Sequence, residues 1–99
     1  MKQLTAKQVE ELLIDEKESL NMIDVREDDE VASGMIPAAK HIPLGSIESR
    51  MDELDKTKEY IMVCRSGGRS GQAAQFLESH GFNVINMTGG MMSWEGPTE

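Results

Sequence analysis

The sequence has few cysteines, few basic residues and no long apolar run, and each shortage excludes a class of protein. Its one cysteine, Cys64, leaves no internal disulfide framework and no all-cysteine zinc site. No segment is apolar enough to span a bilayer, and the polar residues that follow Met1 are not typical of a signal peptide. These absences predict a reducing, cytoplasmic setting.

Positive charge is also scarce, because 10 Lys and Arg stand against 18 Asp and Glu, a formal net charge of −8. Nucleic acids and anionic membranes bind basic surfaces, so neither is an expected partner. Neither histidine belongs to a metal-ligand pattern, and we expect no metal and no cofactor. The chain shows no linker, internal repeat or low-complexity segment, which predicts one domain over residues 1–99.

Apolar periodicity predicts strands that alternate with helices. A capping box of Thr5 with Gln8, and a hydrophobic staple of Leu4 with Val9, predict the start of the first helix. The expected strands are 21–25, 60–63 and 83–87, with an extended connection at 38–42. Further helices are expected at 27–33, from Ser46 through Leu54, at 71–77 with its end before Gly81, and at 91–94. This order predicts an α/β sandwich with a mainly parallel sheet.

The segment 64–70, Cys-Arg-Ser-Gly-Gly-Arg-Ser, joins an expected strand to an expected helix. A strand, a glycine-bearing loop and a helix point several backbone N–H groups at one spot, where the positive end of the helix dipole also lies. With Arg65 and Arg69 beside it, Cys64 is expected to have a lowered pKa and to act as a thiolate nucleophile. Ligands of parallel sheets bind beyond the carboxyl ends of strands, which is where Cys64 falls.

Each of these residues also has a simpler interpretation. A lone cysteine is commonly an inert core residue, although the glycines and arginines around Cys64 favour a reactive thiol. Arg65 and Arg69 can pair with acids, and for Arg69, at the helix start, this alternative stays open. Arg26 and Glu30 have the i,i+4 spacing of a helical ion pair. Methionines and Trp94 are expected to pack in the core, with Met91 or Met92 available to edge a pocket mouth.

Three segments in register resemble the single-domain rhodanese-like sulfurtransferase family. They are residues 23–44, the loop 64–70, and residues 84–94 with Gly89 and Gly90. The resemblance implies a rhodanese-like sandwich, with a mainly parallel sheet of about five strands flanked by helices. The chain departs from the family pattern at Met35, where histidine usually follows glycine, and at Ala38, which replaces a common glycine.

The resemblance implies that Cys64 accepts a sulfane sulfur from thiosulfate or a persulfide donor. The resulting persulfide would pass its outer sulfur to cyanide or to a thiol acceptor, which can belong to a protein. Arg65 is assigned mainly to substrate, and Arg69 is divided between substrate and loop anchoring. The full set of expected substrate-binding residues is Arg65, Ser66, Gly67, Gly68, Arg69 and Ser70, with Asp24 and Arg26 as structural support.

Two alternatives of different kinds remain at this point. Cysteine phosphatases and arsenate reductases place an arginine after five intervening residues, where this chain has Ser70, and Arg69 follows after only four. The shorter loop suits one sulfur atom better than a phosphoryl group. A non-catalytic rhodanese-like sulfur carrier or protein-binding module is the second alternative, although such a module would be expected to lack the cysteine or the loop.

Overall fold

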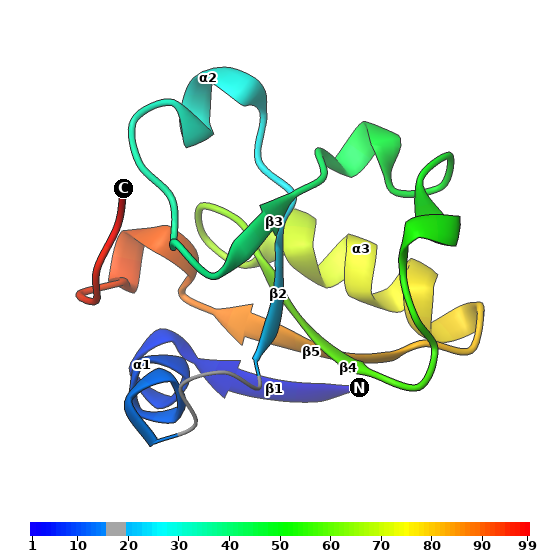
Figure 1. The fold of residues 1–99 in the computed structure, drawn as a ribbon, viewed down its shortest axis with the longest axis horizontal. Helices are drawn as coiled ribbons and strands as arrows, with labels where there is room; N and C mark the ends of the chain where they lie inside the picture. The colour runs from blue at the N-terminus through cyan, green and yellow to red at the C-terminus, as the bar shows by residue number, and fades with distance from the viewer. Residues whose placement is uncertain (16–19) are drawn as a thin grey trace.

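The computed structural model describes residues 1–15 and 20–99. Five strands form one sheet in the order β1-β5-β4-β2-β3, and every pairing between neighbours is parallel. Figure 1 shows a twisted sheet with the short β3 at one edge and β1 at the other. The expected mainly parallel sheet of about five strands is confirmed. The strands are β1 Lys2–Thr5, β2 Asn21–Asp24, β3 Ala39–His41, β4 Glu59–Val63 and β5 Asn83–Thr88.

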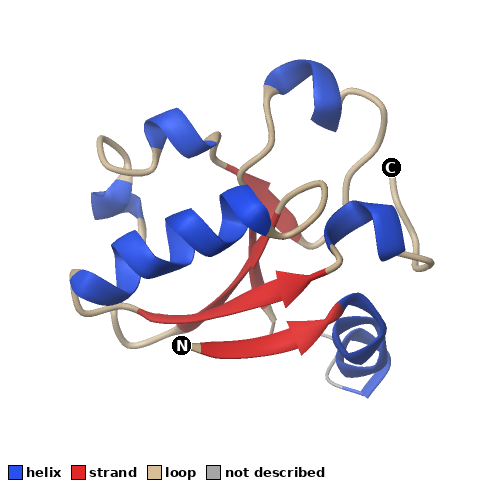
Figure 2. Ribbon diagram, turned by 180° about the vertical axis from the view of Figure 1, so that it is seen from behind, coloured by secondary structure: helices blue, strands red, loops and turns tan. Residues whose placement is uncertain are grey.

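Helices cover both faces of this sheet. The α-helices are α1 Ala6–Asp15, α2 Asp28–Val31 and α3 Gly68–Ser79, and the 3-10 helices are η1 Leu44–Ser46, η2 Met51–Glu53 and η3 Gly90–Ser93. Figure 2 shows α3 lying across one face of the sheet. At the carboxyl ends of β1 and β5, α1 and η3 lie next to each other. None of the helices described has the length and hydropathy needed to cross a membrane.

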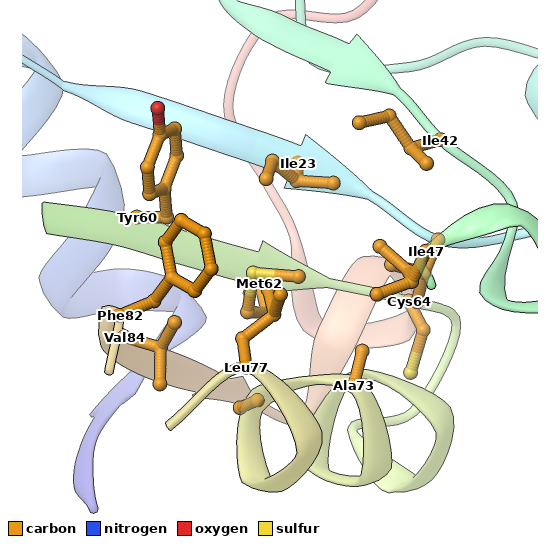
Figure 3. Close-up of a cluster of buried hydrophobic side chains, with 12 residues drawn as sticks. Ile23, Ile42, Ile47, Tyr60, Met62, Cys64, Ala73, Leu77, Phe82 and Val84 are labelled. Atoms are coloured by element: carbon orange, nitrogen blue, oxygen red, sulfur yellow. The ribbon is translucent and has the colours of Figure 1, made fainter. Parts of the chain in front are cut away.

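The central strand β4 supplies side chains to the core on both faces of the sheet. Tyr60, Met62 and Cys64 belong to the cluster packed against α3, where Leu77 also lies (Figure 3). Ile61 and Val63 belong to the cluster on the opposite face, which α1 covers. This explains why β4 is apolar without polar alternation. Cys64 continues the period-2 pattern of the strand, so its sulfur is directed toward the first turn of α3.

The capping box predicted at the start of α1 is confirmed. The backbone N–H of Thr5 donates to Oε1 of Gln8 at 2.8 Å, and the N–H of Gln8 donates to Oγ1 of Thr5 at 3.1 Å. Val9, one turn further on, is completely buried against the sheet. The capped end therefore fixes the angle at which the chain leaves β1 and enters α1.

The predicted helix from Ser46 through Leu54 is wrong, because this segment forms the two separate 3-10 turns η1 and η2. Its apolar residues do pack on the α3 face, so the spacing correctly identified the buried side. Serine, which occurs at positions 46 and 49, is a weak helix former because its hydroxyl competes for backbone hydrogen bonds. Here the hydroxyl of Ser49 donates to the carbonyl oxygen of Ser46 at 3.2 Å, a local bond typical of turns.

Other boundaries also differ from those predicted. The helix expected at 27–33 is reduced to α2, with Glu27 as its N-cap, and the closing helix expected at 91–94 is the 3-10 helix η3. The first strand, β1, was not predicted at all. Its four residues are mostly exposed at the sheet edge, so they carry no run of buried apolar side chains. The extended connection at 38–42 contains the edge strand β3.

The packing predicts that Leu77→Ala lowers the free energy of unfolding by about 2–5 kcal/mol, because Leu77 is completely buried between α3 and the sheet. Ile14→Ala on α1 is the matched control, since Ile14 is 72% exposed, and it should change stability by less than about 0.5 kcal/mol. Urea unfolding of both variants measures the difference. Equal effects would contradict the assignment of the α3 face as the core.

Candidate active site

The loop between β4 and α3 folds its backbone around the sulfur of Cys64. Gly67 has a φ of +108°, in the left-handed region that favours glycine, and this turn lets α3 begin at the next residue. The N–H of Gly67 donates to Cys64 Sγ at 3.0 Å, and Ser70 Oγ lies 3.3 Å from the same sulfur. Cys64 and Ser70 are both completely buried. The sulfur thus lies in a polar cradle beneath the first turn of α3.

Two opposing effects set the pKa of the Cys64 thiol. Burial raises this pKa and is the largest single influence. The hydrogen bond with the Ser70 hydroxyl and those from the backbone N–H groups of Ser70, Gly67 and Ser66 favour the thiolate. Together they outweigh burial, so the pKa of Cys64 lies below its ordinary value. A lowered pKa in a polar environment is expected of a reactive cysteine rather than of an inert core residue.

The other side of the cradle is held by η3. The N–H of Met91 donates to the carbonyl oxygen of Cys64, and the N–H of Met92 donates to that of Arg65, each at 2.9 Å. Gly90, with a φ of +58°, permits this contact, because a Cβ on it would lie 2.6 Å from the carbonyl oxygen of Cys64. The pair Gly89 and Gly90 was part of the sequence resemblance, but its role against the loop could not be predicted from sequence.

Arg69 is engaged by a carboxylate of α2. Its Nη1 and Nη2 donate to Oε1 and Oε2 of Glu30 at 2.6 and 2.8 Å. These hydrogen bonds from Arg69 lower the pKa of Glu30 to about 2, and the hydrogen bond with Glu30 raises the pKa of Arg69. The bidentate geometry ties α2 to the first turn of α3. Of the two roles left open for Arg69, the structure shows the anchoring contact.

The predicted i,i+4 ion pair between Arg26 and Glu30 is wrong, because Arg26 pairs with Asp24 instead. Nε and Nη2 of Arg26 lie 3.0 and 2.9 Å from Oδ1 and Oδ2 of Asp24, and both side chains are buried. Nη2 also donates to the carbonyl oxygen of Gly34 at 2.8 Å. The extended backbone at the end of β2 favours the near neighbour over the helical partner. This pair holds the connection from β2 to β3 in place.

The mouth of the site is an open cavity of about 310 Å³ lined by Arg26, Glu30, Arg65, Met91 and Met92. Arg65 is exposed and forms no ion pair with any residue in the described part of the chain. Met92 is 68% exposed, which agrees with the expectation that a methionine edges the pocket mouth. The mouth therefore offers one unengaged cation beside two polarisable apolar side chains.

The remaining predicted substrate-binding residues, Ser66 and Gly68, lie on the exposed outer side of the loop. One residue of the cradle was not predicted: Asn86 of β5, which contacts both Ser70 and Gly67. The only sequence signal was an asparagine between the apolar residues Ile85 and Met87 of a strand, where that residue type is rare. Within residues 1–15 and 20–99, no three His, Cys, Asp or Glu side chains are grouped to hold a metal ion.

The ion pair with Arg69 predicts a pH dependence that depends on Glu30. Because the folded-state pKa is about 2 against an ordinary 4.5, the contribution of Glu30 to stability is present above pH 4.5 and is lost as the pH falls toward 2. Glu30→Gln should cost about 0.5–1 kcal/mol at neutral pH and abolish this part of the dependence. Urea unfolding of wild type and variant across this interval measures the difference.

Glu53→Gln is the matched control, because the pKa of Glu53 is also lowered to about 2, here by Arg50, the N-cap of η2, and by Lys40 on β3. It should remove a pH dependence of similar size, measured by the same urea unfolding. A Glu30→Gln variant whose stability follows wild type from pH 4.5 downward would contradict the role given to this ion pair.

Comparisons with known proteins agree with this geometry. The family model described as "Rhodanese-like domain" matches residues 5–97. A Bacillus subtilis protein named "Putative sulfurtransferase YtwF" is 54% identical over 86 residues, covering 87% of this chain and 84% of its own. Another from the same organism, "Putative sulfur carrier protein YrkF", is 46% identical over 87 residues, covering 87% of this chain but only 47% of its own.

Among solved structures, a rhodanese-like domain protein from Staphylococcus aureus superposes with a TM-score of 0.93 at 37% identity. That alignment covers 100% of this chain and 97% of the other. The match therefore includes the sheet, the helices on both faces and the loop that carries Cys64. The chain belongs to the rhodanese-like domain family, with single-domain sulfurtransferase relatives.

Proposed function

We propose that this protein is a sulfurtransferase that carries a sulfane sulfur as a persulfide on Cys64. The observation that carries the proposal is the position of its only cysteine, buried beneath the first turn of α3 with the Gly67 N–H on its sulfur. N–H groups gathered at one point stabilise an anionic sulfur without a metal or a cofactor. The relatives named for sulfur transfer and sulfur carriage support the same chemistry.

Loading of the enzyme would be a displacement at sulfur. The Cys64 thiolate attacks the outer sulfur of thiosulfate and forms an S–S bond, while the bond between the two sulfurs of thiosulfate breaks and its electron pair leaves with sulfite. A persulfide donor would react in the same way and release a thiolate. The negative charge then lies on the outer sulfur, within reach of the N–H groups of residues 65–70.

The charges at the mouth favour Arg65 as the residue that binds the donor's anionic group. Arg69 is already neutralised by Glu30, and Arg26 by Asp24, so neither guanidinium has an open bidentate face for substrate. Arg65 lines the mouth and is unengaged among the described residues. A guanidinium recognises a sulfonate-like group by charge-assisted hydrogen bonds. We therefore give Arg65 the substrate role and Arg69 the anchoring role.

Discharge requires a second molecule, because the chain has no other cysteine to attack the persulfide. An acceptor thiolate or cyanide takes the outer sulfur, and the electron pair of the S–S bond returns to Cys64 Sγ. The exposed Met92 beside Arg65 would contact the acceptor, which can be a small thiol or a cysteine of a protein. A reducing compartment such as the cytoplasm would keep Cys64 available between turnovers.

A sulfur carrier without turnover is the second candidate, and the name of the relative YrkF favours it. Such a carrier would accept sulfur on Cys64 and release it only to a dedicated protein. A phosphatase is disfavoured by the loop, in which Arg69 follows Cys64 too early and is held by Glu30. Thiosulfate-to-cyanide and persulfide-to-thiol assays separate the enzyme from the carrier.

The proposal predicts that incubation with thiosulfate adds the mass of one sulfur atom to the intact protein. Dithiothreitol should remove this mass, because a thiol accepts the outer sulfur, and Cys64→Ser should never acquire it. Mass spectrometry of the intact chain measures both. If no adduct formed and the protein hydrolysed an aryl phosphate, the sulfurtransferase proposal would be wrong and a phosphatase activity would take its place.

The charge argument predicts that Arg65→Ala raises KM for thiosulfate about tenfold, as expected for the loss of one charge-assisted hydrogen bond. Arg65→Lys should recover part of the loss, since it keeps the charge without the planar fork. Lys58→Ala is the control, because Lys58 is exposed beyond the opposite end of β4. Steady-state kinetics of folded variants test this, and an unchanged KM in Arg65→Ala would reduce Arg65 to a surface charge.

A further inference from the structure

The amide of Asn86 joins two parts of the cradle from the neighbouring strand β5. Its Nδ2 donates to the carbonyl oxygen of Gly67 at 3.1 Å, and its Oδ1 accepts the hydroxyl proton of Ser70 at 2.6 Å. Asn86 is 6% exposed, so water does not compete freely for these bonds. A carbonyl oxygen can only accept, and the Gly67 contact therefore fixes which end of the amide carries nitrogen. Oδ1 has to face Ser70.

The orientation of this amide decides where the proton of Ser70 points. A serine hydroxyl has one proton, and Oδ1 of Asn86 can only accept, so the short contact directs the proton toward Asn86. The lone pairs of Ser70 Oγ then face Cys64, whose S–H donates to them across 3.3 Å. The result is a buried chain from Cys64 through Ser70 to Asn86 in which every donor has an acceptor.

Ionisation of Cys64 breaks this arrangement. A thiolate can only accept hydrogen bonds, so Ser70 stabilises it only by turning its proton away from Asn86. Oδ1 of Asn86 then loses its hydrogen bond from the Ser70 hydroxyl. If the Ser70 proton stays directed at Asn86 Oδ1 instead, a lone pair of Ser70 Oγ faces the sulfur anion. Either way the thiolate costs one buried hydrogen bond that the thiol retains.

The persulfide also has no proton on Sγ, so the S–H bond to Ser70 is lost there too, but its Sγ is not an anion that competes with Asn86 for the Ser70 proton. Once Sγ is bonded to an outer sulfur, the negative charge lies on the outer atom, and Ser70 keeps its bond with Asn86. We propose that Asn86 is a positioning residue that acts through the Ser70 hydroxyl to disfavour the Cys64 thiolate relative to the thiol and the persulfide. The persulfide part rests on the proposed function. Because discharge returns an electron pair to Sγ as a thiolate, Asn86 slows sulfur release and retains the cargo.

Other charged groups surround the sulfur and are common to every variant compared below. Arg65 belongs to the loop, Arg69 to the start of α3, and Glu30 to α2. Asp24 ends the adjacent strand β2, and Arg26 follows it. The carboxyl end of β5, η1 and η3 contribute no charged side chain. Substitution of Asn86 by an uncharged residue therefore changes hydrogen bonding at the sulfur and leaves the charges in place.

A double-mutant cycle tests the proposal. The ultraviolet absorbance of the thiolate, measured against pH with Cys64→Ser subtracted, reports the only cysteine of the chain. Asn86→Ala should lower the midpoint by about half a unit to one unit, because Ser70 becomes free to donate to the sulfur. In a Ser70→Ala background, the same Asn86→Ala change should shift the midpoint by less than about a third of that amount.

An unchanged or raised midpoint in Asn86→Ala would overturn the proposal. An equal shift in both backgrounds would overturn it as well, because Asn86 would then act through the Gly67 carbonyl and the shape of the loop. Neither measurement requires a sulfur donor, so both stand even if no sulfur transfer is found.

If Asn86→Ala does not fold, the S–H stretching vibration of Cys64 provides the second test. The wild-type band should lie at the lower frequency of a thiol that donates to oxygen, and Ser70→Ala should move it to higher frequency. A band that Ser70→Ala leaves in place would show that the Ser70 oxygen does not accept from Cys64, and the proposal would fail.

Discussion

The hydrogen bond from the Gly67 N–H to Cys64 Sγ is the contact on which the rest of the site depends. It exists because Cys64, the residue that follows β4, directs its side chain toward α3 and because the chain then turns through a positive φ at Gly67. The docking of η3 on the carbonyl groups of Cys64 and Arg65 holds the loop from its other side. The fold thereby places a polar pocket for one sulfur atom at the edge of an apolar core.

Ion pairs divide the arginines around this pocket into two kinds. Arg26 and Arg69 are used to hold α2 and the connection after β2, with Asp24 and Glu30 as their partners. Arg65 stays available at the mouth. A chain with net charge −8 thus presents a local positive site without a basic surface. This arrangement suits a small anionic sulfur donor, since long-range attraction from the whole protein is absent and recognition depends on the loop.

Sequence reasoning was strongest where periodicity and local geometry act over few residues. The buried strands, the capped start of α1 and the strand-loop-helix unit around Cys64 were all predictable, because each follows from adjacent side chains. The hydrogen-bond partners of charged and polar side chains were not predictable. Arg26 has the carboxylates of Asp24 and Glu30 two and four residues away. The extended backbone at the end of β2 brings it to Asp24. The contact of Asn86 with Ser70 joins residues 16 apart on different elements, and no local pattern indicates it.

The covalent persulfide is the central claim, and the initial-rate pattern for thiosulfate and cyanide tests it most directly. Because sulfite leaves before the acceptor reacts, the account predicts double-displacement kinetics, with parallel lines in reciprocal plots at several fixed cyanide concentrations. Intersecting lines would mean that donor and acceptor bind together before any sulfur moves. That result would contradict a free persulfide on Cys64 as the intermediate.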